Sequence, residues 1–229
     1  STFIILFPLV IFLHFWILSS NEKKDFFLNG FFLVIVQNNL FNLNILILSL
    51  LIFKYSLENW KKVIDTNLTG AFNLISQTSP IIKEQSKKDS TYSNGRIINI
   101  ISTAGIWGNF GQAAYASAKS GLIGLTRVAA LDLERSGITC NAIAPFASTR
   151  VTESIIPQNE AQKKYKKSAL KIEAKYVGDL TAFLVSNHGK KYSGQLFGVR
   201  AKEVFLFNQA RPIYNFVRNS KDYVIDLEE

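Results

Sequence analysis

The chain has 229 residues, enough for one α/β domain with a sizeable core. Its formal net charge is +9, but the lysines are spread along the chain and form no basic stripe with interleaved aromatic residues, which argues against a nucleic-acid-binding protein. Cys140 is the single cysteine, which excludes an internal disulfide framework, and His14 and His188 lie far apart without thiol or carboxylate clusters, so no metal site is predicted. The chain contains no methionine and begins with Ser1, which we interpret as a fragment or an imperfect gene model.

Residues 1–53 differ in composition from the rest of the chain. Phe3 to Leu18 is an apolar run interrupted by Pro8 and His14, and its 16 residues are fewer than the roughly 20 that cross a bilayer. A second run, Leu40 to Phe53, consists mainly of Leu, Ile, Phe and Asn and could make a marginal membrane span. Neither run shows clear amphipathic periodicity, and a membrane anchor remains an open alternative for this segment.

The next elements are a long helix and a loop. Leu57 is predicted to begin a helix, and Trp60 to Pro80 carries apolar residues at helical spacing. Asn67 lies inside this helix, although asparagine is unfavourable there because its side chain competes for backbone hydrogen bonds. Lys83 to Asn94 is polar and charged without apolar rhythm and is predicted to be a surface loop.

The central stretch predicts a strand, a loop, a helix and a second strand. Arg96 to Ile101 is a short apolar run typical of a buried parallel strand, and a Gly-rich loop follows from Ser102 to Gly111. Gln112 to Arg135 has the spacing of an amphipathic helix, which Gly137 is expected to close. Ile138 to Ala144 gives the second strand, so the fold class is α/β with a parallel sheet.

The C-terminal part predicts two helices and a final hairpin. Gln158 to Ile172 is Lys-rich and is expected to form a helical segment over a substrate cleft. Val177 to Val185 is predicted to be a helix with Asp179 as its cap. Ser193 to Gly198 leads into a last strand, and Glu203 to Phe207 is expected to pair with it as a hairpin.

Three polar groups are predicted to meet in the central stretch. Tyr115 and Lys119 are four residues apart, so they share one face of the helix, and Ser102 follows the carboxyl end of a parallel strand. An ammonium near a phenol favours the phenolate and lowers the tyrosine pKa from about 10, so the phenol can serve as acid or base. A serine hydroxyl can hydrogen-bond a carbonyl oxygen on which negative charge develops.

These residues resemble the short-chain dehydrogenases/reductases. Ser102, Tyr115 and Lys119 match the Ser and Tyr-x-x-x-Lys pattern of that family, and the thirteen-residue spacing from Ser102 to Tyr115 is typical of it. The tracts Gly-Arg-Ile-Ile-Asn-Ile, Gly-Gln-Ala-Ala-Tyr-Ala-Ser-Ala-Lys and Gly-Ile-Thr-Cys-Asn-Ala-Ile-Ala-Pro match as well, and Asn67-Leu-Thr-Gly70 matches the family's catalytic Asn-x-x-Gly. The resemblance implies a Rossmann-like, doubly wound parallel sheet.

The resemblance also implies roles for the matching residues. Tyr115 would exchange the proton of the substrate hydroxyl, Lys119 would lower the Tyr115 pKa and bind the nicotinamide ribose, and Ser102 would orient the substrate oxygen. Asn67 would hold a water in a proton relay. Ile143 of the second strand and Pro145, which follows that strand, would pack near the nicotinamide. The implied cofactor is NAD, with NADP as an alternative, and the implied assembly is a homo-oligomer.

The family's N-terminal phosphate loop, Thr-Gly-x-x-x-Gly-x-Gly, is not found, because Gly30 is the only glycine before Gly70. Phe41-Asn-Leu-Asn44 stands near the place of the Asn-Asn-Ala-Gly segment but contains no glycine. We therefore expect that residues 1–53 are not native dinucleotide-fold sequence, that the N-terminal βαβ half is replaced or missing, and that residues 54–229 form a partial domain. A truncated form or pseudoenzyme that cannot hold cofactor, and a membrane-anchored dehydrogenase, are the alternatives.

One branch of the family is closest in its local sequence. Phe146 stands directly after Pro145, where most members have glycine, and Ser-Thr-Arg-Val-Thr-Glu follows shortly after it. This tract resembles the (3R)-hydroxyacyl-CoA dehydrogenase unit of the peroxisomal multifunctional β-oxidation enzyme and its bacterial relatives, as do Gly105 to Ala114 and Glu203 to Ile213. The implied substrate is a 3-hydroxyacyl-CoA and the implied compartment is the peroxisome or the cytoplasm. Another acyl substrate or a hydroxysteroid is the alternative.

Overall fold

A mixed sheet organises the protein, whose computed structural model describes residues 32–36, 51–88, 95–147, 157 and 159–209. Among these residues five strands form one sheet in the order in which they follow along the chain. The strands are β1 (Phe32–Val36), β2 (Gly95–Ile100), β3 (Thr139–Phe146), β4 (Leu196–Arg200) and β5 (Glu203–Leu206). Strands β1 to β4 run parallel, and β5 returns antiparallel to β4. The predicted α/β fold with a parallel sheet is confirmed, and so is the C-terminal hairpin.

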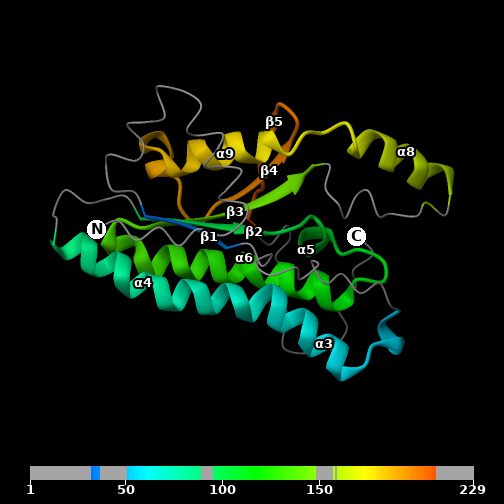
Figure 1. Cartoon of the computed structure of the whole chain (residues 1–229), viewed down its shortest axis with the longest axis horizontal. Coiled ribbons are helices and arrows are strands. Elements are labelled where there is room, and N and C mark those ends of the chain that lie inside the picture. Colours follow the sequence, from blue (N-terminus) through cyan, green and yellow to red (C-terminus); the bar gives the residue numbers. More distant parts are fainter. Residues whose placement is uncertain (1–31, 37–50, 89–94, 148–156, 158, 210–229) are drawn as a thin grey trace, which may run out of the picture.

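Helices cover both faces of the sheet (Figure 1). The longest two, α4 and α6, lie side by side on one face, whereas α9 lies on the other. The α-helices of the described residues are α3 (Leu57–Ile64), α4 (Gly70–Lys88), α5 (Ala104–Trp107), α6 (Ala113–Leu133), α8 (Glu160–Ala169) and α9 (Lys175–Val185). A π-helical segment, η3 (Asp65–Thr69), joins α3 to α4, and short 3₁₀ turns are η2 (Ile52–Lys54), η4 (Glu134–Ser136) and η5 (Asn187–Lys191). This is the doubly wound arrangement that the family resemblance implies.

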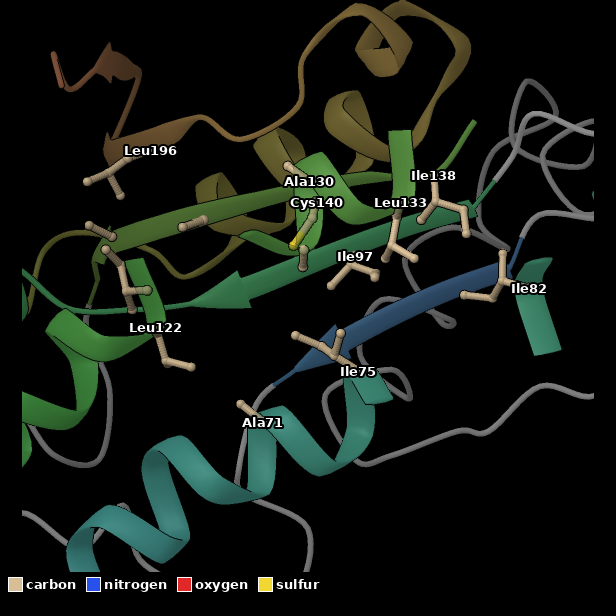
Figure 2. Packing of buried hydrophobic residues seen from close by; sticks show 14 residues of the cluster. Ala71, Ile75, Ile82, Ile97, Leu122, Ala130, Leu133, Ile138, Cys140 and Leu196 are labelled. Atoms are coloured by element: carbon tan, nitrogen blue, oxygen red, sulfur yellow. The ribbon is translucent and has the colours of Figure 1, made fainter. Parts of the chain in front are cut away.

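The core consists of two apolar layers, one on each face of the sheet. Successive strand residues point to opposite faces, so Ile97 packs with α4 and α6, while its neighbour Ile98 packs with α9. Figure 2 shows the first layer, in which Cys140 of β3 is fully buried near Ile97, as expected of a small core residue. Burial raises the pKa of the Cys140 thiol to about 12. Because both faces are covered, β2 and β3 are buried along most of their length without alternation.

The central predicted elements agree with the structure within two residues. β2, α6 and β3 correspond to the predicted strand, helix and strand. Gly137 ends the helical stretch with a φ of 67°, a left-handed conformation that glycine adopts without steric cost.

The loop predicted from Lys83 to Asn94 is wrong over its first half, because α4 continues to Lys88 with Pro80 inside it. Ile82 is fully buried, and the Ser86 hydroxyl donates a hydrogen bond of 3.2 Å to the carbonyl of Ser136. These tertiary contacts extend the helix past the proline and past the apolar rhythm that the sequence shows. Residues 89–94 lie outside the described part.

The start of α9 also differs from the prediction. The helix begins at Lys175, its N-cap residue is Ala174 without a side-chain hydrogen bond, and Asp179 lies in its interior. Tyr176 and Val177 pack against the α9 side of the core, which holds the first turn in helical conformation despite Gly178. The helical segment expected within residues 158–172 is present as α8. Its place over a cleft remains a prediction.

Strand β1 lies inside the N-terminal segment, to which the sequence analysis assigned no strand. It pairs in parallel with β2, from Phe32 opposite Gly95 to Val36 opposite Asn99. The run from Phe3 to Leu18, the Phe41–Asn44 tract and the run from Leu40 up to residue 50 lie outside the described residues. The division of the chain at residue 53 remains a prediction. In the described part, no helix has the length and apolar composition needed to cross a membrane.

Candidate active site

The candidate site lies at the carboxyl end of β2, where α6 carries two of the predicted residues past the end of the strand. Ser102 follows β2 by two residues, and Tyr115 and Lys119 lie on α6 one turn apart. The Lys119 ammonium donates a hydrogen bond of 3.0 Å to the carbonyl of Ile100, the last residue of β2. This bond joins the helix directly to the strand end.

Ser102 is fixed by the backbone that follows it. The Ala104 N–H donates to the Ser102 hydroxyl oxygen at 3.2 Å, and the Gly105 N–H donates to the Ser102 carbonyl at 2.9 Å. The Ser102 hydroxyl lies near enough to the Tyr115 phenol to act on it as a hydrogen-bond partner, and this interaction lowers the pKa of Tyr115. The structure thus brings Ser102 and Tyr115 together.

Tyr115 has 7% of its surface exposed and packs with Val63, Ala104 and Ala114. Burial raises the pKa of Tyr115 above its usual value, because the phenolate loses hydration, and the hydrogen bond from Ser102 offsets only part of this rise. The family resemblance implies that Lys119 lowers this pKa, but in this structure the net effect on the pKa of Tyr115 is a rise. The ammonium is directed to the Ile100 carbonyl and lies 5.7 Å from the centre of the Tyr115 ring, so desolvation of the phenol dominates.

Lys119 is itself a buried cation, with 8% of its surface exposed. Burial lowers the pKa of its ammonium to about 8, since the charged form is poorly solvated. One of its three N–H donors is directed to Ile100, which leaves the others for ligands. At neutral pH the side chain is mainly charged.

Asn67 lies in the π-helical segment η3, which packs against α6. It is 2% exposed, and its side-chain N–H donates to the carbonyl of Val63 at 3.1 Å. Val63 in turn contacts the cluster around Tyr115. π-helical turns are rare and occur often at functional sites, and this one explains how an asparagine is accommodated inside a long helix.

The two predicted nicotinamide contacts, Ile143 and Pro145, lie on β3. Ile143 is fully buried in the α9 side of the core, and its carbonyl accepts the Ile101 N–H at 2.9 Å. Pro145 is half-buried near the carboxyl end of the strand. Their role toward a cofactor remains a prediction. No group of three or more metal-ligating side chains is found among the described residues.

Sequence reasoning missed two residues that shape the site. Val63 accepts the Asn67 hydrogen bond and packs near Tyr115, but its apolar spacing in α3 shows only that it is buried. Gly105 lets α5 approach the backbone of α6 at Lys119, since a Cβ there would lie 2.6 Å from the Lys119 carbonyl carbon. Its position three residues after Ser102 was the only signal in the sequence.

Residues 34–200 match the family model described as enoyl-(acyl carrier protein) reductase. The chain is similar to a 3-oxoacyl-[acyl-carrier-protein] reductase of Synechocystis sp., with 44% identity over 106 residues that cover 46% of this chain and 40% of the relative. It is also similar to the peroxisomal hydratase-dehydrogenase-epimerase of Saccharomyces cerevisiae, with 36% identity over 138 residues that cover 60% of this chain and 14% of the relative.

A solved structure of a short chain dehydrogenase from Mycobacterium avium is similar in fold, with a TM-score of 0.65 and 26% sequence identity. The match covers 86% of this chain and 61% of that protein. The chain therefore spans less than two thirds of the length of each of these three proteins.

Proposed function

Because the chain belongs to the short-chain dehydrogenases/reductases, oxidoreductases that use NAD(P), we propose that its catalytic segment oxidises a 3-hydroxyacyl thioester, a 3-hydroxyacyl-CoA, with NAD. The observation that carries the proposal is that Ser102, Tyr115 and Lys119 meet at the carboxyl end of β2, where Lys119 donates a hydrogen bond to the Ile100 carbonyl and Ser102 acts on the Tyr115 phenol. The name of the similar 3-oxoacyl-[acyl-carrier-protein] reductase and the description of the family model support the acyl substrate class.

In this proposal Tyr115 accepts the proton of the substrate hydroxyl, or returns it in the reverse reaction. The Ser102 hydroxyl orients the substrate oxygen and stabilises charge on it as the carbonyl forms. Lys119 supplies a positive charge within the same buried site, and Asn67 positions a water that connects this site to solvent. The raised pKa of Tyr115 means that the free phenol is protonated at neutral pH, the state that donates a proton in the reverse reaction, so oxidation requires that binding of substrate and cofactor favour the phenolate.

The donors at this edge of the sheet fit the nicotinamide half of the cofactor. Lys119 keeps donors for the hydroxyls of a ribose, and Ile143 and Pro145 would offer apolar contacts to the ring. When bound, NAD accepts the hydride from the substrate carbon. The pyrophosphate half is different, because no Gly-rich loop is found in residues 1–69 to supply its backbone donors.

The experiment uses a chimera in which the N-terminal half of a similar short-chain dehydrogenase, up to its strand equivalent to β1, replaces residues 1–31. NADH formation at 340 nm is followed with 3-hydroxyacyl-CoA, with the acyl-carrier-protein thioester and with a hydroxysteroid. We expect turnover with the acyl-CoA and with NAD in preference to NADP. Turnover of the hydroxysteroid alone would contradict the substrate, and no turnover with any substrate by a folded chimera would contradict the function.

The proposed assembly is a homo-oligomer, as is common in the family. The similarity to a peroxisomal enzyme supports the peroxisome as the compartment, with the cytoplasm as the alternative.

A further inference from the structure

The one-turn helix α5 is held directly against the helix that carries Tyr115 and Lys119. A Cβ at Gly105 would lie 2.6 Å from the carbonyl carbon of Lys119 and 2.7 Å from the backbone nitrogen of Ser120. Real Cβ atoms do not approach other atoms so closely, and backbone atoms in the middle of a long helix cannot move aside as a flexible side chain does. Only glycine therefore allows α5 to lie at this distance from α6.

A second contact holds the other end of α5. The ring of Trp107 meets the ring of Phe207 edge-to-face at a centroid distance of 5.8 Å, and Phe207 meets Phe205 of β5 in the same way. Trp107 is otherwise 67% exposed, so this contact provides much of the packing of its side chain.

Ser102 is tied to this helix through its own hydrogen bonds. Its carbonyl accepts the Gly105 N–H, and its hydroxyl oxygen accepts the Ala104 N–H. With one lone pair occupied by Ala104, the hydroxyl proton is free to be donated to the phenol oxygen of Tyr115, which is the direction that favours the phenolate. The position of α5 therefore decides where the Ser102 hydroxyl lies relative to Tyr115.

We propose that Gly105 is a positioning residue for the Ser102–Tyr115 pair: it seats α5 on the backbone of α6 at Lys119, and Trp107 secures the opposite end of the helix on Phe207. The inference rests on the proposed function for its catalytic meaning. A larger residue at position 105 lifts α5 from α6, moves Ser102 away from Tyr115 and removes the hydrogen bond between their side chains. Displacements of about 1 Å in such groups can reduce turnover about 100-fold.

The test follows the titration of Tyr115 in the 229-residue chain by NMR of ¹³C-labelled tyrosine side chains. The signal of Tyr115 is identified by its loss in Tyr115→Phe, and Ser102→Ala gives the full effect of removing the hydroxyl. We expect Gly105→Ala to raise the pKa of Tyr115 by at least half of the Ser102→Ala effect. In the double variant Ser102→Ala/Gly105→Ala, Gly105→Ala should add no further shift, because it acts through Ser102.

The matched control is Gly124→Ala on α6, where an added Cβ meets no atom within 4 Å, and which should leave the Tyr115 titration unchanged. If Gly105→Ala does not fold, Trp107→Leu decides, with a smaller rise in the pKa of Tyr115 expected. An unchanged titration in the folded Gly105→Ala variant, or in Trp107→Leu where it decides, overturns the inference. The inference is also overturned if Gly105→Ala shifts the pKa of Tyr115 equally in the wild-type chain and in Ser102→Ala. The measurement contains neither substrate nor cofactor, so failure of the proposed function leaves it intact.

Discussion

Two opposing effects act on the pKa of Tyr115. Burial against Val63, Ala104 and Ala114 raises it, and hydrogen bonding with Ser102 lowers it. Burial is the larger one, so the phenol holds its proton at neutral pH until a neighbouring charge or a bound ligand changes the balance. A general acid–base group works best when its pKa is near the working pH. The site therefore needs the positive charge of Lys119 to act on Tyr115 more strongly in the working complex than it does in this structure.

Tyr115→Phe tests the proton-transfer role in the chimera described above. Phe keeps the packing of the ring and removes the oxygen, so turnover should fall by about 10²–10⁴-fold while cofactor affinity is nearly retained. Steady-state kinetics and a separate NAD titration measure the two effects. Lys119→Ala should weaken both, since Lys119 is assigned to the ribose as well. Retention of more than about a tenth of turnover by Tyr115→Phe would contradict the mechanism.

Lys119 should make the stability of the protein depend on pH. The pKa of Lys119 is about 8 in the folded chain and near 10.5 in the unfolded one. Below pH 8 the side chain is charged in both states, so the cost of burying the cation lowers the free energy of unfolding in full. Between pH 8 and pH 9 the unfolded chain binds more protons, and the free energy of unfolding should rise by roughly 1 kcal/mol. Above pH 9 the Cys140 thiol, with its pKa raised to about 12, acts in the opposite direction.

Urea unfolding between pH 7 and pH 9 measures this dependence. Lys119→Met should be more stable than the wild type at pH 7, and the rise between pH 8 and pH 9 should disappear. Lys83→Met, which changes an exposed lysine of α4, is the matched control and should keep the rise. An equal rise in Lys119→Met would show that Lys119 is not the group responsible.

Local sequence was sufficient to locate a helix or strand where its pattern of apolar residues was clear. Short apolar runs located β2 and β3, apolar residues at helical spacing located α6, and the i, i+4 spacing placed Tyr115 and Lys119 on one face of that helix. The end of α4 and the start of α9 were missed because Ile82 and Tyr176 hold these turns in place through contacts far away in the sequence. Strand β1 was missed because an apolar run shows no strand period when its neighbours are equally apolar.

The hairpin of β4 and β5 provides a prediction of its own. A Cβ at Gly198 would overlap the ring of Phe205 and lie 2.9 Å from the ring of Phe207. Gly198→Ala should therefore lower the free energy of unfolding by about 1–3 kcal/mol, as expected for overpacking. Chemical denaturation measures it, and Phe205→Leu in the same chain should restore part of the loss. Additive destabilisation in the double variant would show that the two residues do not share this space.

In the molecule as a whole, the sequence predicts the candidate site well but shows no phosphate-binding loop in the N-terminal part. The candidate site could be predicted from a few residues because they are close in sequence, between 102 and 119. The raised pKa of Tyr115 and the role of Gly105 could not, since both depend on how α3, α5 and α6 pack around the site. The phosphate-binding half of a dinucleotide fold has no counterpart in the glycine pattern of residues 1–69.

We expect the 229-residue chain to bind NAD weakly or not at all, because the pyrophosphate lacks the backbone donors of a Gly-rich loop. Isothermal titration calorimetry measures this directly, and the chimera serves as the positive control. Micromolar affinity of the unaltered chain would contradict the expectation and would leave the assignments of Ser102, Tyr115 and Lys119 in place.

The π-helical segment between α3 and α4 also keeps the buried side chains of these two helices on one side of the continuous helical stretch. Val63, Asn67, Ala71 and Ile75 are all buried at steps of four residues, and each such step overshoots a full α-helical turn by about 40°. The wider turn at Asp65–Thr69, closed by the Gly70 N–H on the Asp65 carbonyl, absorbs this drift. Deleting one residue there would allow a regular α-helix but turn α4 by about 100° relative to α3. Either Asn67 or the pair Ala71 and Ile75 would then lose its place against α6 and the sheet, so the length of this segment is as constrained as its sequence.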